Sequence, residues 1–154
     1  MMNRQRLWRR YALGAVFLVT AFAAIAAAAD GTMEVRDRTG SSSARIEADG
    51  TVRDRSGSTM GRIESGGTVR DRSGSTLGRV DENGTLRDRS GSTIGRVEDN
   101  GTVRDRSGST VGRIDKDGTI RDRSGSTVAS VRPYVPDARR TVAAFIYFFT
   151  PWLR

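Results

Sequence analysis

Apolar residues are sparse over most of the chain and recur at a fixed spacing. In residues 67–83, which read GTVRDRSGSTLGRVDEN, only Val69, Leu77 and Val80 suit a hydrophobic core, and the same pattern returns 17 residues later. Stretches rich in Thr, Val, Ile and Leu between glycine-containing dipeptides predict short strands, and glycine and serine are too frequent for helices. We therefore expect two short antiparallel strands in each unit and a meander of about twelve strands.

The repeat can be followed through residues 35–131. Five copies carry the full phrase GT-x-RDRSGST, an earlier copy from Val35 is diverged, and the last copy loses the pattern after Thr127. Such atypical copies are typical of the two ends of a repeat array. The first glycine of each complete copy follows Asp, Asn or Gly, which favours the tight primed turns of hairpins, and Ser-Gly forms a second turn halfway along. The structural turn glycines are Gly50, Gly67, Gly84, Gly101 and Gly118.

The apolar spacing also predicts how the units assemble. Leu77 and Val80 break the strict alternation of a strand, so Gly78 is expected to mark a bulge or a bend. Three apolar residues bury too little surface to order a 17-residue hairpin by itself, so neighbouring hairpins must share one core. Closure into a ring removes exposed strand edges, whereas a parallel β-helix would need turns built for three faces. The expected fold is therefore all-β, a closed ring of short antiparallel hairpins.

A family resemblance supports this fold. The phrase GTVRDRSGST followed by an aliphatic residue and Gly-Arg, the apolar N-terminal segment and the stretch AAFIYFF together resemble the five-fold beta-flower protein family over residues 33–149. The resemblance implies a small exported bacterial protein whose hairpins form a petalled ring with about five-fold symmetry. The partial copy from Val35 is expected either to supply a closing strand or to offset the ring by half a unit. Because the family has no established biochemical activity, the resemblance implies a fold and not a function.

The N-terminal segment has the pattern of a secretory signal peptide. Residues 1–29 have four arginines among the first ten residues, continue with an apolar run and end in small residues, and Ala27 and Ala29 suit cleavage before Asp30. An uncleaved anchor helix is the alternative, and Arg9-Arg10 gives only weak support for twin-arginine export. The repeats lie outside the cytoplasm in each case, because the positive end stays inside. We expect an exported protein, periplasmic or secreted, or else anchored in the inner membrane. Its parts are a signal or anchor at 1–29, hairpin repeats at 30–131, and a proline linker with an apolar C-terminal segment at 132–154.

The segment 132–154 joins a proline-containing linker to a short apolar stretch. Asp137 can cap a helix that begins at Ala138 and is stopped by Pro151. The apolar stretch is too short to span a membrane and apolar on every side, so we expect it to plug or cap the ring. Two alternatives stay open: docking on a membrane surface or a partner, with Trp152 and Arg154 at the interface, and a short strand added to the sheet. The residues expected to be buried are Phe145, Ile146, Phe148 and Phe149.

The excess of basic over acidic residues gives only weak evidence about function. The chain carries 26 basic residues, all arginine except Lys116, against 18 acidic ones. Without residues 1–29 the basic count is 22, and no nucleic-acid binding is expected of an exported chain whose repeats alternate both signs. Twelve of the 25 arginines belong to Arg-Asp-Arg triplets, whose two arginines would share one face of a strand. They give two candidate anion-binding bands, one of Arg53, Arg70, Arg87, Arg104 and Arg121, the other of Arg55, Arg72, Arg89, Arg106 and Arg123.

Two interpretations of these bands stay open. Arginine bands suit phosphate and carboxylate groups, such as those of lipopolysaccharide or acidic glycans. The simpler interpretation is that the arginines pair with acids of adjacent strands in solvated ladders. The acids in question are Glu64, Asp81, Glu98 and Asp115. The triplet aspartates are expected to bind backbone amides; a calcium site is disfavoured, because two arginines flank each aspartate.

The sequence gives little support to catalysis. The chain has no Cys and no His, which removes disulfides, the commonest zinc ligands and the commonest general base. The acids repeat in identical surroundings, whereas acid–base catalysis needs two carboxylates in different ones, and the glycines have hairpin spacing rather than that of a phosphate-binding loop. We expect no enzyme activity and no metal or cofactor. The expected function is a structural or interaction module of the bacterial envelope with an unidentified partner; the alternative is a binding protein for anionic envelope polymers. Membrane contact is expected only through residues 138–154 or an uncleaved N-terminus.

Overall fold

The computed structural model describes residues 31–150 and Trp152, so the signal or anchor expected at residues 1–29 lies outside the described chain. The strands are β1 (Met33–Asp37), β2 (Ser42–Ile46), β3 (Thr51–Asp54), β4 (Thr59–Ile63), β5 (Thr68–Asp71), β6 (Thr76–Val80), β7 (Thr85–Asp88), β8 (Thr93–Val97), β9 (Thr102–Asp105), β10 (Thr110–Ile114), β11 (Thr119–Asp122) and β12 (Thr127–Arg132). A 3-10 helix, η1 (Pro136–Ala138), and an α-helix, α2 (Arg139–Phe149), follow them.

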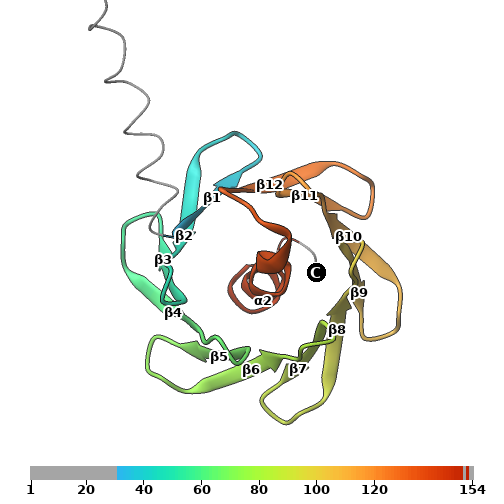
Figure 1. Cartoon of the computed structure of the whole chain (residues 1–154), viewed down its shortest axis with the longest axis horizontal. Helices are drawn as coiled ribbons and strands as arrows, with labels where there is room; N and C mark the ends of the chain where they lie inside the picture. Colours follow the sequence, from blue (N-terminus) through green and yellow to red (C-terminus); the bar gives the residue numbers. More distant parts are fainter. Residues whose placement is uncertain (1–30, 151, 153–154) are drawn as a thin grey trace, which may run out of the picture. The chain divides into compact units, whose positions relative to one another are not determined.

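The twelve strands form one closed antiparallel ring. Consecutive strands pair along the chain, and β1 pairs with β12, with Val35 opposite Val131. The hairpins β1–β2, β3–β4, β5–β6, β7–β8, β9–β10 and β11–β12 spread outward around the centre, and we call them petals (Figure 1). The expected ring of hairpins is confirmed. The expected five-fold symmetry is not, because the twelve strands make six petals: the diverged copy from Val35 forms a whole hairpin, and its first strand closes the ring against the atypical last strand.

Two kinds of turn alternate along the chain. A petal turn joins the strands of one petal, as at residues 72–75, and an inner turn joins successive petals, as at residues 81–84. In both, the glycine amide donates to the carbonyl three residues earlier: Gly74 to Asp71 and Gly84 to Asp81, each at 3.0 Å. These glycines have φ of 86° and 81°, and no other residue type within the described chain has a positive φ. The prediction of primed turns is therefore wrong. The turns are type I turns followed by a left-handed glycine, which require only one positive φ.

Each petal contains a β-bulge, as the sequence predicts. Val69 lies opposite Gly78 and Arg70 opposite Thr76, so Leu77 is an extra residue in β6. The same shift in register recurs in the other petals. The bulge accounts for the broken alternation of apolar residues, since alternation resumes only from Gly78 onward.

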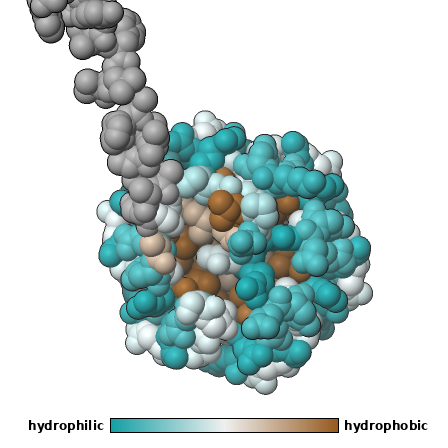
Figure 2. Space-filling view, in the orientation of Figure 1, coloured by the Kyte–Doolittle hydropathy of each residue, from teal (hydrophilic) through white to brown (hydrophobic). Residues whose placement is uncertain are grey.

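The interior of the ring is built from stacked tiers of small and aliphatic residues. The odd-numbered strands supply one buried tier: Val35, Val52, Val69, Leu86, Val103 and Ile120. The even-numbered strands supply a second: Ile46, Ile63, Val80, Val97, Ile114 and Val131. They also supply a third, which has almost no side chains: Ala44, Gly61, Gly78, Gly95, Gly112 and Ala129. In one view of the surface, hydrophobic residues gather in the centre and hydrophilic residues cover the petals (Figure 2).

Helix α2 lies in the centre of the ring and fills it (Figure 1). Phe145 and Ile146 are buried together with Val142, Ala143 and Ala144, whereas Phe148 and Phe149 are partly buried. The aromatic rings near the helix end explain the glycine tier: a Cβ added to Gly78 would lie 2.6 Å from the Phe148 ring, and one added to Gly61 would lie 2.7 Å from Phe149. The open choice between helix and strand for this segment is therefore settled in favour of a helix that plugs the ring.

One detail of the C-terminal segment differs from the prediction from sequence. Asp137 does not cap α2, because it lies within η1; the N-cap is Ala138, and no side chain bonds there. Residues 132–150 belong to the same compact unit as the strands. Polar contacts also hold the plug: Tyr147 Oη donates to the carbonyl of Arg104 at 2.6 Å, and Arg139 donates to the carbonyls of Glu98 and Asp99. No helix of the described residues is long and apolar enough to cross a membrane.

Candidate functional site

In each of the five complete copies of the repeat, the first arginine of the triplet is half-exposed and is held by an acid of the preceding inner turn. Arg70 Nε donates to Glu64 Oε1 at 2.8 Å, and its Nη1 donates to the carbonyl of Gly74 at 3.1 Å and to the hydroxyl of Thr76 at 3.3 Å. The same contact to an acid recurs at Arg53 with Glu47, Arg87 with Asp81, Arg104 with Glu98, and Arg121 with Asp115. The predicted pairing with acids is therefore present, and this band of arginines ties inner turns to petal turns.

The arginine of the Gly-Arg dipeptide, which the sequence analysis did not single out, shares the acid with the first triplet arginine in two copies of the repeat. Arg79 lies directly opposite Arg87 across β6 and β7. Asp81 accepts from both, at 2.6 Å from Arg79 Nε and 2.8 Å from Arg87 Nε. The guanidinium of Arg87, followed by that of Arg79, holds the pKa of Asp81 below its usual range. Asp115 pairs with two arginines in the same way. The signal was in the sequence, because a Gly-Arg dipeptide precedes each of these acids by two residues.

The second arginine of each triplet has a different position. β5 ends at Asp71, so Arg72 lies in the petal turn, where the alternation expected for a strand does not apply. Its equivalents are placed in the same way, and within residues 31–150 none of them is in an ion pair; Arg123 Nε donates to the carbonyl of Thr110 at 3.0 Å. These exposed residues are Arg55, Arg72, Arg89, Arg106 and Arg123. Of the two candidate bands, this one extends into solvent and is available to an anion.

The triplet aspartate organises the petal turn. Asp71 Oδ1 accepts from the hydroxyl of Ser73 at 2.6 Å and from the amides of Ser73 and Ser75 at 2.8 and 3.0 Å. The hydroxyl, and after it the two amides, hold the pKa of Asp71 below its usual value of 3.8. The equivalent bonds occur at Asp37, Asp54, Asp88, Asp105 and Asp122. These carboxylates are ionised at neutral pH and committed to backbone amides, which makes them poor proton donors.

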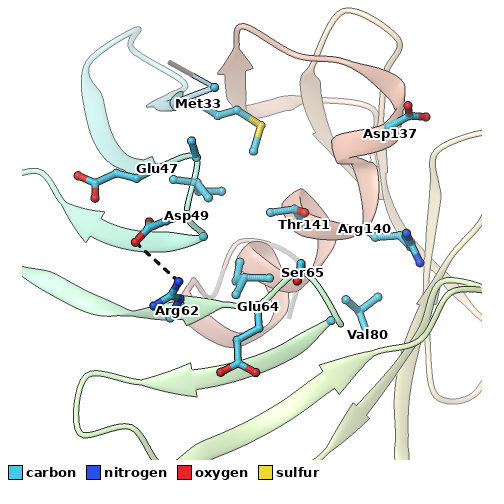
Figure 3. Close-up of a pocket in the computed structure, with 16 residues that line it drawn as sticks. Met33, Glu47, Asp49, Arg62, Glu64, Ser65, Val80, Asp137, Arg140 and Thr141 are labelled. Carbon is cyan, nitrogen blue, oxygen red and sulfur yellow. Dashed lines mark ion pairs between the residues drawn. The ribbon is translucent and has the colours of Figure 1, made fainter. Parts of the chain in front are cut away.

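A pocket of about 430 Å³ lies where α2 enters the ring (Figure 3). Its lining combines aliphatic side chains of the first petals with polar groups of the inner turns and of the helix start. Glu47 and Glu64 point away from it, and Asp49 pairs with Arg62 at 3.8 Å (Figure 3). The hydroxyl-bearing Ser65 and Thr141 also line the pocket. The arrangement offers aliphatic side chains beside hydroxyl and charged groups for binding. Within the described part of the chain, no group of three or more His, Cys, Asp and Glu residues could hold a metal ion.

Comparison with known proteins bears on the fold. The sequence pattern of the family described as "5-fold beta-flower protein" matches residues 32–150, which is most of the chain and all of the ring and plug. No curated protein and no solved structure matches the chain.

Proposed function

The chain belongs to the 5-fold beta-flower protein family, and we propose that it acts as a non-enzymatic structural or interaction module of the bacterial envelope. The observation that supports this proposal is the equivalence of the petals. Each petal turn has the same Asp-centred hydrogen bonds, and each complete copy places one exposed arginine at the same position of the turn. A closed ring thus presents several copies of one polar loop, which favours multivalent contact with a repetitive partner.

The chemistry of these side chains also favours binding over catalysis. A general acid needs a raised pKa, whereas the pKa values of the petal-turn aspartates are lowered by hydroxyl and amide donors. The serine hydroxyls of these turns donate to the same carboxylates at 2.6 Å. Their oxygens therefore face an acceptor that is already satisfied and weakly basic, which gives no activated nucleophile.

A second candidate function is binding of anionic envelope polymers, such as lipopolysaccharide or acidic glycans. It is favoured by the position of the second triplet arginine, as at Arg72, outside the ion pairs that hold the first. Guanidinium groups suit bidentate contacts to phosphate and carboxylate groups. A row of anionic groups could bridge several petals at once, so that weak individual contacts would add up.

Export is tested by locating the chain in the cell. A C-terminally tagged full chain is followed by fractionation and by protease treatment of cells with a permeable outer membrane, and mass spectrometry defines the mature N-terminus. We expect the ring outside the cytoplasm and a mature chain that begins at Asp30. Recovery of the intact, protease-protected chain from the cytoplasm would overturn the envelope proposal.

Polymer binding is tested by a salt titration with immobilised lipopolysaccharide and a soluble acidic glycan. We expect affinity that falls steeply as salt is added, because the contacts are between exposed charges. Replacing Arg72, Arg89 and Arg106 by Gln should weaken binding at low salt. Absence of binding at low salt would exclude this second candidate and leave the interaction module to another partner.

A further inference from the structure

One end of the ring, the end that carries the petal turns, has an incompletely covered apolar centre. The bulge residue is the first apolar residue after each petal turn, and it packs against the core while remaining partly exposed. These residues are Met60, Leu77, Ile94, Val111 and Val128. Helix α2 ends close to this tier, since the ring of Phe148 packs against Gly78, the neighbour of Leu77. Phe149 and Trp152 are also only partly buried.

The same end carries exposed arginines. Each of the six Arg-Asp-Arg triplets runs from the end of an odd-numbered strand into a petal turn. The first arginine of each triplet pairs with an acid, so its charge is balanced there. The second arginine lies in the petal turn and, within residues 31–150, is in no ion pair. Exposed arginines therefore surround the apolar tier at this end of the ring.

We infer that the petal end is a docking face for a membrane surface that contains anionic phospholipids. An apolar centre with partly exposed aromatic residues inserts shallowly into the headgroup region, and the surrounding arginines bind lipid phosphates. Arg72 and its equivalents supply exposed charges that are free to bind phosphate, because no acid pairs with them within residues 31–150. This inference goes beyond the interaction module proposed above, because it names a lipid surface and the face that meets it.

Vesicle binding provides the test. Residues 31–154 form a compact unit with its own core, so the chain from Asp30 onward can be used, and Trp152 is then its only tryptophan. Binding is measured by co-sedimentation with vesicles of mixed phosphatidylglycerol and phosphatidylcholine, and with vesicles of phosphatidylcholine alone. Vesicles with brominated acyl chains report by quenching whether Trp152 reaches the bilayer. We expect binding to the anionic vesicles only, strong quenching of Trp152, and release by salt.

Matched triple variants separate orientation from net charge. One variant replaces Arg72, Arg89 and Arg106 by Gln, and the control replaces Arg45, Arg62 and Arg96, which lie in strands nearer the inner turns. Both remove three positive charges, and thermal melts establish that both are folded. An arginine at an anionic surface contributes roughly a fivefold factor, so the petal variant should lose about a hundredfold in affinity. The control should lose less than about a tenth as much, since its charges lie farther from the bilayer.

Three results would overturn the inference. Equal loss in both triple variants would mean that net charge alone attracts the ring. Binding to anionic vesicles without quenching of Trp152 would mean that another face meets the lipid. A chain that binds a soluble acidic glycan but no vesicle would likewise exclude the membrane while supporting the polymer candidate, so the two proposals fail separately.

Discussion

Gly67 and Gly74 belong to one repeat, share one backbone conformation and have opposite surroundings. Both have φ of 86°, in the left-handed region that disfavours other residues. A Cβ on Gly67, in an inner turn, would lie 2.0 Å from the carbonyl oxygen of Val80, which lies across the β5–β6 hairpin that follows, whereas a Cβ on Gly74, in a petal turn, would meet nothing within 4 Å. The two Gly→Ala substitutions therefore separate backbone strain from close contact at the base of a petal.

The structure gives different magnitudes for the two substitutions. For Gly74→Ala the left-handed conformation costs about 1–2 kcal/mol. The stiffer unfolded chain offsets roughly 0.4–1 kcal/mol of it, so the net loss is about 1 kcal/mol. Gly67→Ala has the same strain and must also displace a backbone carbonyl, which adds roughly 1–3 kcal/mol of overpacking. It also weakens the 2.8 Å bond from the Val80 amide to the Gly67 carbonyl, worth about 1 kcal/mol. We expect a total loss of roughly 3–5 kcal/mol for Gly67→Ala.

Chemical denaturation followed by far-ultraviolet circular dichroism measures both variants against the parent chain. The slope of unfolding free energy with denaturant should be unchanged, and the midpoint should fall much further for Gly67→Ala. In thermal melts, the difference between the variants should be at least about 6 °C. Equal destabilisation by the two substitutions would refute the conclusion that the inner-turn glycine packs closely against the opposite strand at the base of its petal. A larger effect of Gly74→Ala would place the critical contact at the petal turns instead.

Three further predictions follow from the plug and the turns. Gly78→Ala should lower the free energy of unfolding by roughly 2–4 kcal/mol in denaturant titrations, because its Cβ would meet the Phe148 ring and a backbone carbonyl. A loss of stability smaller than that of a surface substitution would contradict this packing. Phe145→Ala should lower the free energy of unfolding by about 3–5 kcal/mol. Deletion of residues 138–154 should lower the melting temperature further, and an unchanged melting temperature in the deletion variant would show that the ring does not need its plug. The free energy of unfolding should be constant from neutral pH down to about 4 and then fall. The reason is that the pKa of carboxyls such as Asp71 is lower in the folded chain than in the unfolded chain. Such a carboxyl stabilises the fold above its unfolded-state pKa, and this stabilisation is lost as the pH falls through its folded-state pKa. Thermal melts across this pH range measure the loss of stability in acid. Asp71→Asn should make that loss slightly smaller, and a stability that rises on acidification would contradict the prediction.

The strands and turns of a petal could be predicted, because the residues that determine them lie within one 17-residue repeat. The strands, the two turns and the bulge near Gly78 follow from glycine positions and from the alternation of apolar residues. The turn type was missed because Asn-Gly and Asp-Gly fit two geometries. Only the structure shows that a single positive φ, at Gly84 for example, is used. The pairing of arginines with acids also followed from the sequence, whereas the second arginine was misplaced because the end of β5 at Asp71 could not be located to one residue.

The number of petals could not be predicted, because nothing within 17 residues specifies how many hairpins close into a ring. The number of repeat copies sets an upper limit on the number of petals. The diverged copy from Val35 must be counted among them, because it forms a whole petal. The helix supplies the second constraint. The glycine tier leaves a bore lined by backbone, and the Phe148 ring already lies where a Cβ of Gly78 would be. A ring with one petal fewer would have a narrower bore and would press this aromatic ring into the wall. The C-terminal segment therefore favours closure with six petals, and the six-petal ring in turn explains why a segment too apolar to lie in water is stable as a helix.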